Sequence, residues 1–287
     1  PAGGAILAGR IALECGLDKV LSYDMGGTTA KICLIDEGKP QTSRTFEVDR
    51  QYRFTKGSGL PLRIPVIEMV EIGAGGGSIA QIDNLNRVQV GPESAGSEPG
   101  PACYGQGGEG ATVTDADVAL GRIAPEGFAG GSMNLSPQLS LDALEQAIGT
   151  RLNLDGPLAA FAVSEMVEEN MSNAARVHAV EQGKELAART LIAFGGAAPL
   201  HACRMAEKLN MDRVIIPQGA GVGSAIGFLA APVSYEVVRS RYTKLEEFEP
   251  AALSRMFAEM HGEAFDIVSA GAPGAELDER RIAYMRY

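Results

Sequence analysis

The sequence is poor in the residues that build metal centres and disulfide frameworks. Its 287 residues include four cysteines, three histidines and no tryptophan, and no two cysteines have C-x-x-C spacing. These counts argue against a disulfide scaffold or a structural zinc site, and scattered thiols are typical of a cytoplasmic protein. No apolar run approaches the roughly 18 to 20 residues that a membrane-spanning helix needs. The first residues also lack the basic region of a signal peptide.

An excess of positive charge is missing as well. The formal net charge is −11 at pH 7, which argues against a nucleic acid or an anionic membrane as partner. A hydrophobic share of 45% and a charged share of 21% are ordinary for a globular protein with a sizeable core. Glycine is abundant instead, with 36 residues in clusters. Clustered glycine indicates backbone brought close to another group.

The order of apolar segments predicts an α/β fold with a mixed sheet and flanking helices. In chain order we expect a helix over 3–15, a hairpin over 20–36, helical segments over about 140–182, a strand over 190–194, a helix after 197, a strand over 233–245 and an amphipathic helix from 250. Segment 91–115 is rich in glycine and proline, as a linker would be. Cys103 and Tyr104 within it favour an ordered loop.

The first candidate for chemistry is the hairpin tip in "SYDMGGTTAKI". Backbone amides of Gly26 and Gly27 can cradle phosphate oxygens, and Thr28 and Thr29 add hydroxyl donors. Asp24 would repel a phosphate, so it makes sense if Mg²⁺ lies between the carboxylate and the phosphates. The alternative is a plain turn in which Asp24 caps backbone amides.

The second candidate is "IAFGGAAPLHA", residues 192–202, where a buried strand runs into glycines and then a helix. Such a turn lets the backbone approach a flat ligand and points a helix N-terminus at it. Tight packing alone could also explain these glycines. Neither this segment nor "GAGVGS" at 219–224 satisfies the G-x-G-x-x-G fingerprint of a dinucleotide site in register.

The two elements together resemble the ATP-holding motifs of the actin-like ATPase superfamily, whose fold is ribonuclease H-like. "SYDMGGTTAKICLID", "EIGAGGGSIAQID", "ENMSNAARVHAVEQG", "AFGGAAPLHACRMAEKL" and the long "VGPESAGSEPGPACYGQGGEGATVTDADVALGRI" are more specific. They are similar to the A-type subunit of the hydantoinase/oxoprolinase family, which includes N-methylhydantoinases, 5-oxoprolinases and ketone carboxylase subunits. The resemblance extends over residues 1–287. Because family members are longer, we expect the chain to be one ATPase lobe that lacks an N-terminal region and is inactive alone.

The resemblance implies roles for particular residues. Asp24 corresponds to the catalytic, magnesium-facing carboxylate. The residues implied in binding ATP are Gly26, Gly27, Thr28 and Thr29 at the phosphates, Gly195, Gly196 and Ala197 at the adenosine, Gly75, Gly76 and Gly77 in a family-typical loop, and His201 beside the adenosine motif. Many relatives carry an acidic residue soon after the threonines, where this chain has Lys31. That lysine could contact phosphate or point to solvent.

Other residues leave alternatives open. Cys103 could be a nucleophile, although nothing basic lies near it in sequence. Asp115 and Asp117 would share one face if their segment were a strand, and either could instead cap a helix. His178 lies on the apolar stripe of its helix and is expected in the core.

The resemblance implies the nucleotide-binding lobe of an ATP-dependent enzyme that phosphorylates a cyclic amide or a ketone. Ring-opening hydrolysis or carboxylation would follow. ATP and Mg²⁺ are the expected cofactors, and a B-type subunit or domain is the expected partner. The alternatives are an ATP-responsive module without amide chemistry and a kinase of the same superfamily.

Overall fold

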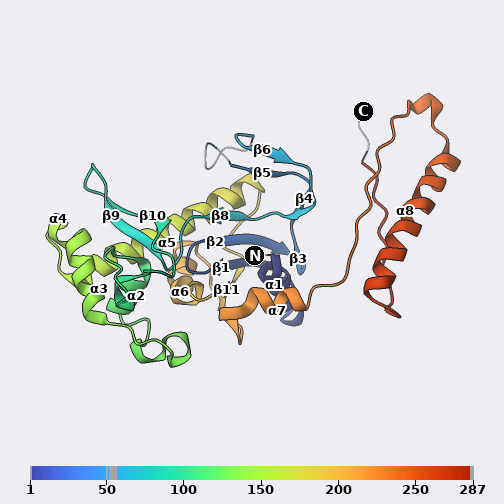
Figure 1. The fold of residues 1–287 in the computed structure, drawn as a ribbon. Helices are drawn as coiled ribbons and strands as arrows, with labels where there is room; N and C mark the ends of the chain where they lie inside the picture. The colour runs from blue at the N-terminus through green and yellow to red at the C-terminus, as the bar shows by residue number, and fades with distance from the viewer. Residues whose placement is uncertain (1, 50, 52–56, 285–287) are drawn as a thin grey trace. The chain divides into compact units, whose positions relative to one another are not determined.

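The computed structural model describes residues 2–49, 51 and 57–284. Contacts within the chain divide it into two compact units, Pro1–Ala230 and Ala231–Tyr287. The first unit contains the mixed sheet and most of the helices, and the second contains one long helix (Figure 1). The expected α/β fold with a mixed sheet and flanking helices is confirmed. None of the described helices combines the length and the apolarity that crossing a bilayer requires.

The main sheet joins segments from both ends of the first unit. Its strands are β1 (Lys19–Met25), β2 (Ala30–Asp36), β3 (Lys39–Pro40), β8 (Val70–Ile72), β11 (Thr190–Phe194) and β12 (Val214–Ile215). The order is β12-β11-β1-β2-β3, and β8 also pairs with β2. Strands β1 and β2 form the predicted antiparallel hairpin. Strand β11 runs parallel to β1, so distant segments end at the same edge.

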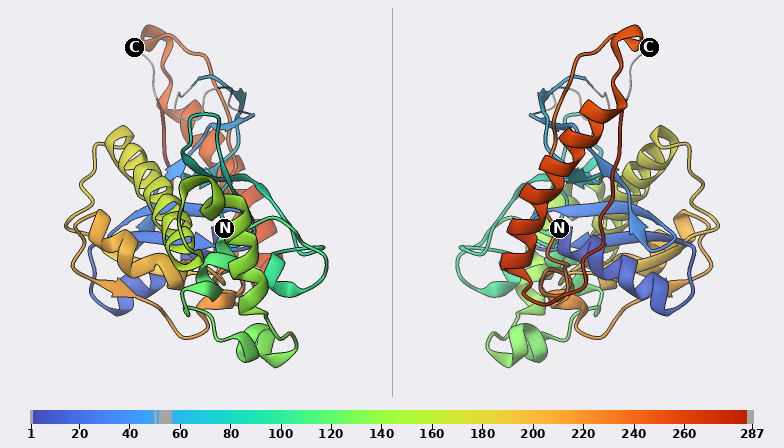
Figure 2. Two further views of the ribbon diagram at one scale, coloured as in Figure 1. Left: turned by 90° about the vertical axis from the view of Figure 1, so that its left-hand side faces the viewer. Right: turned by 90° about the vertical axis from the view of Figure 1, so that its right-hand side faces the viewer.

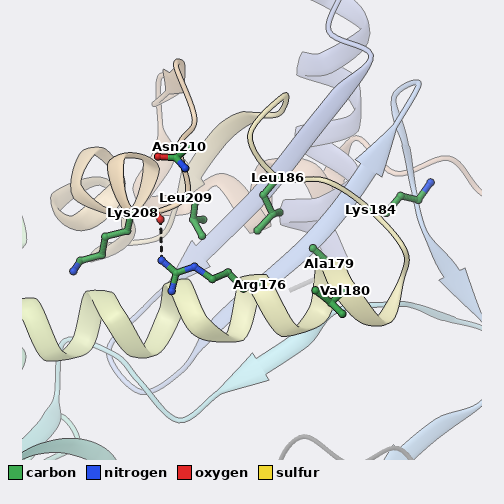
Figure 3. Close-up of a pocket in the computed structure, with 8 residues that line it drawn as sticks. All are labelled: Arg176, Ala179, Val180, Lys184, Leu186, Lys208, Leu209 and Asn210. Carbon is green, nitrogen blue, oxygen red and sulfur yellow. Dashed lines mark hydrogen bonds between the residues drawn. The ribbon is translucent and has the colours of Figure 1, made fainter.

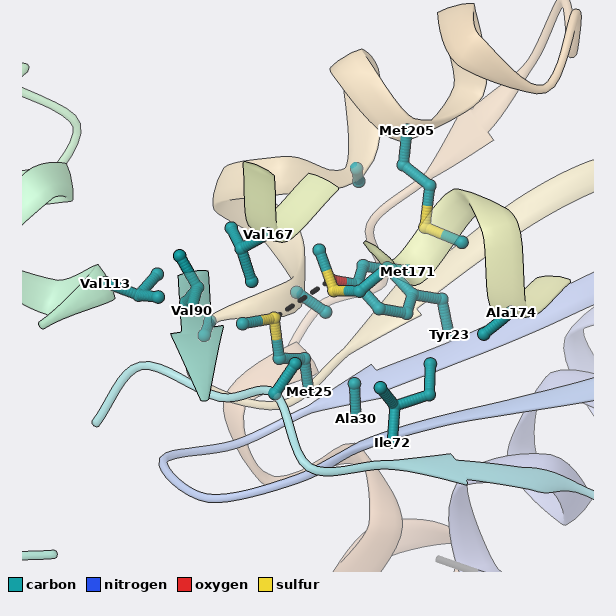
Figure 4. Close-up of a cluster of buried hydrophobic side chains, with 14 of the residues drawn as sticks. Tyr23, Met25, Ala30, Ile72, Val90, Val113, Val167, Met171, Ala174 and Met205 are labelled. Carbon is teal, nitrogen blue, oxygen red and sulfur yellow. Dashed lines mark hydrogen bonds between the residues drawn. The ribbon is translucent and has the colours of Figure 1, made fainter. Parts of the chain in front are cut away.

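Alternation along β1 gives the sheet two buried faces. Val20 packs with the helix α1 (Ala2–Glu14), whereas Leu21 and Tyr23 face the opposite side. That side is covered by the helices α5 (Gly156–Glu181) and α6 (Ala198–Lys208) (Figure 2). The fully buried Tyr23 hydroxyl lies 2.9 Å from the sulfur atom of Met25 and 2.7 Å from that of Met171, and its one proton can donate to either (Figure 4). The contact with Met171 joins β1 to α5.

The remaining elements of the first unit are not part of the main sheet. They are the short strands β4 (Thr42–Ser43), β5 (Phe46–Val48), β6 (Leu60–Leu62) and β7 (Val66–Ile67), the hairpin β9 (Ser78–Ile82) and β10 (Val88–Ser94), and the helices α2 (Val113–Ala119), α3 (Pro137–Leu144), α4 (Thr150–Leu152) and α7 (Gly223–Leu229). Single 3₁₀ turns occur at Ala102–Tyr104 and Ala220–Val222, and a π-helical turn spans Glu145–Gly149. The 3₁₀ segment Pro125–Gly131 is interrupted by a kink at Phe128, Ala129 and Gly130.

The segment before α2 is held by one buried carboxylate. Asp115 accepts backbone N–H bonds from Ala102 at 3.2 Å, Cys103 at 2.8 Å and Thr112 at 2.9 Å. The hydroxyl of Ser140 donates to it at 3.2 Å. Since the carboxylate satisfies several backbone donors at once, a loop rich in glycine and proline is fixed without a ladder of its own.

The second unit corrects one prediction. Residues 233–244 form no strand, and among the described residues no strand pairs with their backbone. An apolar, β-branched run becomes a strand only when a neighbouring edge accepts its backbone bonds, and here none does. A 3₁₀ turn follows at Leu245–Glu247. The predicted amphipathic helix is present as α8 (Pro250–Gly271).

Candidate functional site

The parallel pairing of β1 and β11 brings the two sequence motifs together. Asp24 lies opposite Phe194 in the register, so the turns after both strands meet at one edge. The amide of Ala197 donates to the Met25 carbonyl at 3.0 Å, which ties the second turn to the hairpin. Clefts for ligands in open α/β sheets commonly form where strands end.

Gly195 is required by this close approach. It adopts a left-handed φ of 83°, and a Cβ there would lie 2.8 Å from Asp24 Oδ1 and from the Met25 carbonyl carbon. Its amide donates to the Ala220 carbonyl at 2.8 Å. The glycine therefore lets three segments of the chain converge beside the carboxylate.

At three neighbouring positions, packing within the chain does not require glycine. Gly26, Gly27 and Gly196 have φ values outside the left-handed region, and a Cβ on any of them would meet nothing within 4 Å. Gly27 and Gly196 are exposed. Because the chain's own packing would accept a side chain at each, their lack of one leaves bare backbone facing open space beside Asp24. Bare backbone of this kind suits close contact with a ligand.

The glycine loop at 75–77 packs against the hairpin tip and is not part of the open backbone beside Asp24. Gly76 donates its amide to the Gly26 carbonyl at 3.0 Å, and Gly77 donates to the Gly27 carbonyl at 2.6 Å. A Cβ on Gly75 would lie 2.5 Å from the Gly27 carbonyl carbon and from the Thr28 amide nitrogen. All three loop glycines are buried, so they hold the tip in place from behind.

The hydroxyl-bearing side chains at the tip differ in exposure. Thr28 is exposed and Thr29 is half-buried. Lys31 donates to the Thr29 hydroxyl and lies 3.3 Å from Glu71 Oε1, with 19% of its side chain exposed. Lys31 is therefore mostly covered and paired, which differs from the solvent-pointing alternative. Thr28 keeps its side chain at the open face.

His201 is close to the second motif but is fully buried. Its Nδ1 lies 3.0 Å from Glu168 Oε1, and its Nε2 lies 3.2 Å from Asp117 Oδ2. Arg122 bridges the same two carboxylates at 3.1 and 3.2 Å and donates to the Ser164 hydroxyl at 2.7 Å. Burial by itself lowers the pKa of His201, but its bonds to both carboxylates and their negative charge raise that pKa to about 9. The imidazole has no exposed surface for a ligand in this structure.

The structure also assigns places to the other candidates. Cys103 is buried, and burial together with Asp115 raises its pKa, so its thiol is protonated at neutral pH. Asp115 and Asp117 lie on a helix, not a strand, and therefore point about 200° apart. Asp115 accepts the hydrogen bonds that hold the preceding loop, and Asp117 contacts His201 and Arg122. His178 is buried, as expected.

Ser224 is a member of the site that sequence reasoning missed. It lies in the first turn of α7, and its hydroxyl donates to Asp24 Oδ2. The two residues are 200 positions apart. The signal in the sequence was the segment "GAGVGS", which ends at Ser224 and is too short to identify without the fold.

A separate cavity of about 230 Å³ lies between the end of α5 and the end of α6 (Figure 3). The positively charged side chains that line this cavity already have partners within the protein. Arg176 bonds to Glu169 at 2.9 Å and to the Lys208 carbonyl at 2.8 Å, and Lys184 pairs with Asp36 at 2.8 Å. None of the glycine motifs lines this cavity. The candidate site is therefore the edge formed by the two turns.

The sequence is similar to that of known proteins from one family. A sequence model described as "Hydantoinase/oxoprolinase" matches residues 1–237. An uncharacterized protein of Methanocaldococcus jannaschii is 35% identical over 263 residues, which cover 91% of this chain and 38% of that protein. The caprolactamase subunit alpha of Pseudomonas jessenii is 36% identical, over 83% of this chain and 33% of that subunit.

Two solved structures share the fold over nearly the whole chain. A nucleotide-free acetone carboxylase matches with a TM-score of 0.79 and 27% identity, over 95% of this chain and 38% of that one. The ATP-dependent caprolactamase from Pseudomonas jessenii matches with a TM-score of 0.75 and 31% identity, over 96% and 39%. The chain thus spans well under half the length of the relatives it matches.

Proposed function

The chain belongs to the hydantoinase/oxoprolinase family, and we propose that it is the nucleotide-binding lobe of an ATP-dependent enzyme of this family. The proposed enzyme phosphorylates a cyclic amide or a ketone. Ring-opening hydrolysis or carboxylation of the phosphorylated group follows. Relatives named as caprolactamase and acetone carboxylase, described as ATP-dependent, support this class of reaction.

The observation that carries the proposal is the bare backbone beside Asp24. Gly26, Gly27 and Gly196 have no packing reason to be glycine, and two strands from distant parts of the chain bring them together. The Gly26 amide donates to the Thr29 carbonyl at 3.2 Å, so the backbone amides at 27–29, with the Thr28 hydroxyl, would hold phosphate oxygens. The turn at 195–197 would hold the adenosine, with α6 beginning directly behind it.

Asp24 fits a magnesium ion that a nucleotide brings with it. Mg²⁺ in nucleotide sites keeps several waters and takes one or two carboxylates together with substrate phosphates. One half-buried carboxylate beside the phosphate cradle meets that requirement. A cage built from protein side chains alone is a different design, and the described residues contain no group of three candidate ligands for it.

The chemistry that bound Mg·ATP would supply is transfer of the γ-phosphoryl group to the amide or carbonyl oxygen, with ADP as leaving group. The chain's own residues would bind and orient the nucleotide, and positioning of this kind provides most of the rate in phosphoryl transfer. A partner that completes the reaction is part of the proposal, because the similar caprolactamase and acetone carboxylase chains are named as subunits. A reducing compartment such as the cytoplasm suits the four free thiols.

Calorimetric titration of Mg·ATP into the full-length polypeptide tests the proposal. We expect binding in the wild type and loss of at least about tenfold in affinity in Asp24→Asn and in Gly196→Val. Gly127→Val is the matched control, because Gly127 is exposed, has no left-handed φ and would place its Cβ 3.9 Å from Ala124. Unchanged affinity in both site variants would refute the assignment.

Phosphate release distinguishes the amide-directed enzyme from a nucleotide-responsive module or a kinase. With the partner subunit present, we expect release to be stimulated by lactams, hydantoins or ketones. Basal release that none of these compounds changes would favour the nucleotide-responsive module. Stimulation by a hydroxylated compound, with a phosphorylated product, would favour the kinase.

A further inference from the structure

The segment 219–224 reaches the site through a helix contact that only glycine permits. A Cβ on Gly3 of α1 would lie 2.9 Å from the Phe228 amide nitrogen of α7 and closer still to the Ser224 carbonyl oxygen. A Cβ on Gly227 would overlap the Gly3 carbonyl and lie 2.9 Å from the Leu7 side chain. The two helices therefore touch backbone to backbone, at a separation that side chains would prevent.

Two further glycines direct this contact toward Asp24. Gly223 lies against the ring of Phe194, the last residue of β11, where a Cβ would come within 2.5 Å of a ring carbon. Gly4 leaves the room that Ser224 and Asp24 occupy: its Cβ would lie 2.8 Å from Ser224 Oγ and 3.1 Å from Asp24 Oδ2. The first turn of α7 is thus fixed by α1 and β11 with its hydroxyl on the carboxylate.

Among the described residues, the Ser224 hydroxyl is the single hydrogen-bond donor that reaches the Asp24 carboxylate. A carboxylate at the end of a strand can rotate about its terminal torsion, which is broad and soft. A charge-assisted hydrogen bond to one oxygen restricts that rotation and fixes where the other oxygen points.

We propose that Ser224 is a positioning residue of the nucleotide site, holding the Asp24 carboxylate in the orientation that meets the magnesium ion of Mg·ATP. The proposal rests on the function proposed above. In this arrangement the glycines of α1 allow α7 to pack closely enough for the Ser224 hydroxyl to reach Asp24. Ser224 itself need not touch the nucleotide.

The test is a double-mutant cycle in the full-length polypeptide, with Ser224→Ala, Asp24→Ala and the double variant titrated with Mg·ATP. Losing a hydrogen bond to a charged group should weaken binding by about fivefold to twentyfold in Ser224→Ala. Because Ser224 acts through Asp24, the double variant should bind no more weakly than Asp24→Ala alone. Ser132→Ala, which removes an exposed hydroxyl from a distant loop, is the matched control.

Magnesium dependence separates positioning from simple loss of structure. Ser224→Ala should weaken the binding of Mg·ATP and leave the binding of ATP in excess EDTA unchanged. Gly4→Ala tests the same pair without removing either group, because its methyl would push Ser224 and Asp24 apart. We expect it to weaken Mg·ATP binding by a similar factor while thermal unfolding confirms that the protein remains folded.

The outcomes are distinguishable. Wild-type affinity in Ser224→Ala, equal losses with and without magnesium, or additive losses in the double variant would each overturn the role of Ser224 while leaving the nucleotide site in place. A wild type that does not bind Mg·ATP, or an Asp24→Ala variant that binds normally, would overturn the proposed function and this inference with it.

Discussion

The buried charge network around His201 makes the stability of the protein depend on pH in a predictable direction. Two carboxylates, Asp117 and Glu168, contact the two ring nitrogens of the imidazole, and both nitrogens can donate only when the ring is protonated. Arg122 supplies the second positive charge. Two negative and two positive groups are thus balanced inside the protein, next to the buried ring of Tyr23, whose pKa is raised by its own burial and by both carboxylates.

The magnitude follows from the shift in the pKa of His201. Its pKa is about 9 in the folded protein and 6.5 for an unperturbed histidine, and each pH unit corresponds to about 1.4 kcal/mol, which gives about 3 kcal/mol. Since the folded pKa is the higher one, the folded protein holds this proton more tightly. The stabilisation is complete below pH 6.5 and is lost as the pH rises through 9. Burial raises the pKa of the Cys33 thiol from 9 to about 12, so this thiol lowers stability further only above about pH 9. The hydrogen bond from Arg204 lowers the pKa of Glu165 from 4.5 to about 2, which lies below this window.

Urea unfolding at a series of pH values from 6 to 9 measures the effect. We expect the free energy of unfolding to fall by about 3 kcal/mol across the range in the wild type. His201→Gln should be less stable at pH 6, because it leaves two buried carboxylates with one cation, and its stability should vary much less with pH. His261→Gln, at an exposed histidine of the second unit, is the control. Equal pH dependence in His201→Gln and the wild type would refute the reasoning.

Three further predictions concern the first unit. Asp115→Asn should lower the free energy of unfolding by about 3 kcal/mol in urea titrations, because an amide nitrogen would face backbone donors that a carboxylate accepts. Cys103 should react with a thiol reagent only after unfolding, whereas the exposed Cys15 and Cys203 should react in the native protein; rapid native modification of Cys103 would contradict its burial. Gly75→Ala should lower the free energy of unfolding by about 2 kcal/mol by calorimetry, because its methyl would meet the backbone of the hairpin tip 2.5 Å away.

Features encoded within short stretches were predictable from the sequence. The hairpin over 20–36 follows from two apolar runs around a glycine turn, and the amphipathic pattern from 250 predicts α8. The run at 233–245 has a similar local pattern and is not a strand. Its failure has a physical cause, since strand formation depends on a partner edge that the run itself does not encode.

The contacts that assemble the site were not predictable in the same way. Ser224 bonds to Asp24 across 200 residues, and His201 meets Glu168 across 33. Both contacts depend on β11 entering the sheet parallel to β1 and on helices packing across it, which no local spacing encodes. Sequence reasoning therefore placed His201 at the ligand because it follows the glycines closely. The fold instead turns its ring inward, where two carboxylates hold it.

The fold divides the glycines of the sequence into two classes that composition alone does not distinguish. Gly75 and Gly195 are glycine because another part of the chain occupies the place of a side chain. Gly26, Gly27 and Gly196 have free space where a side chain would lie. Folding alone imposes no reason to keep these three bare, and a bare residue loses conformational freedom on folding. A requirement from outside the chain accounts for them best, and their position around the Asp24 carboxylate is the ground on which we proposed the nucleotide site.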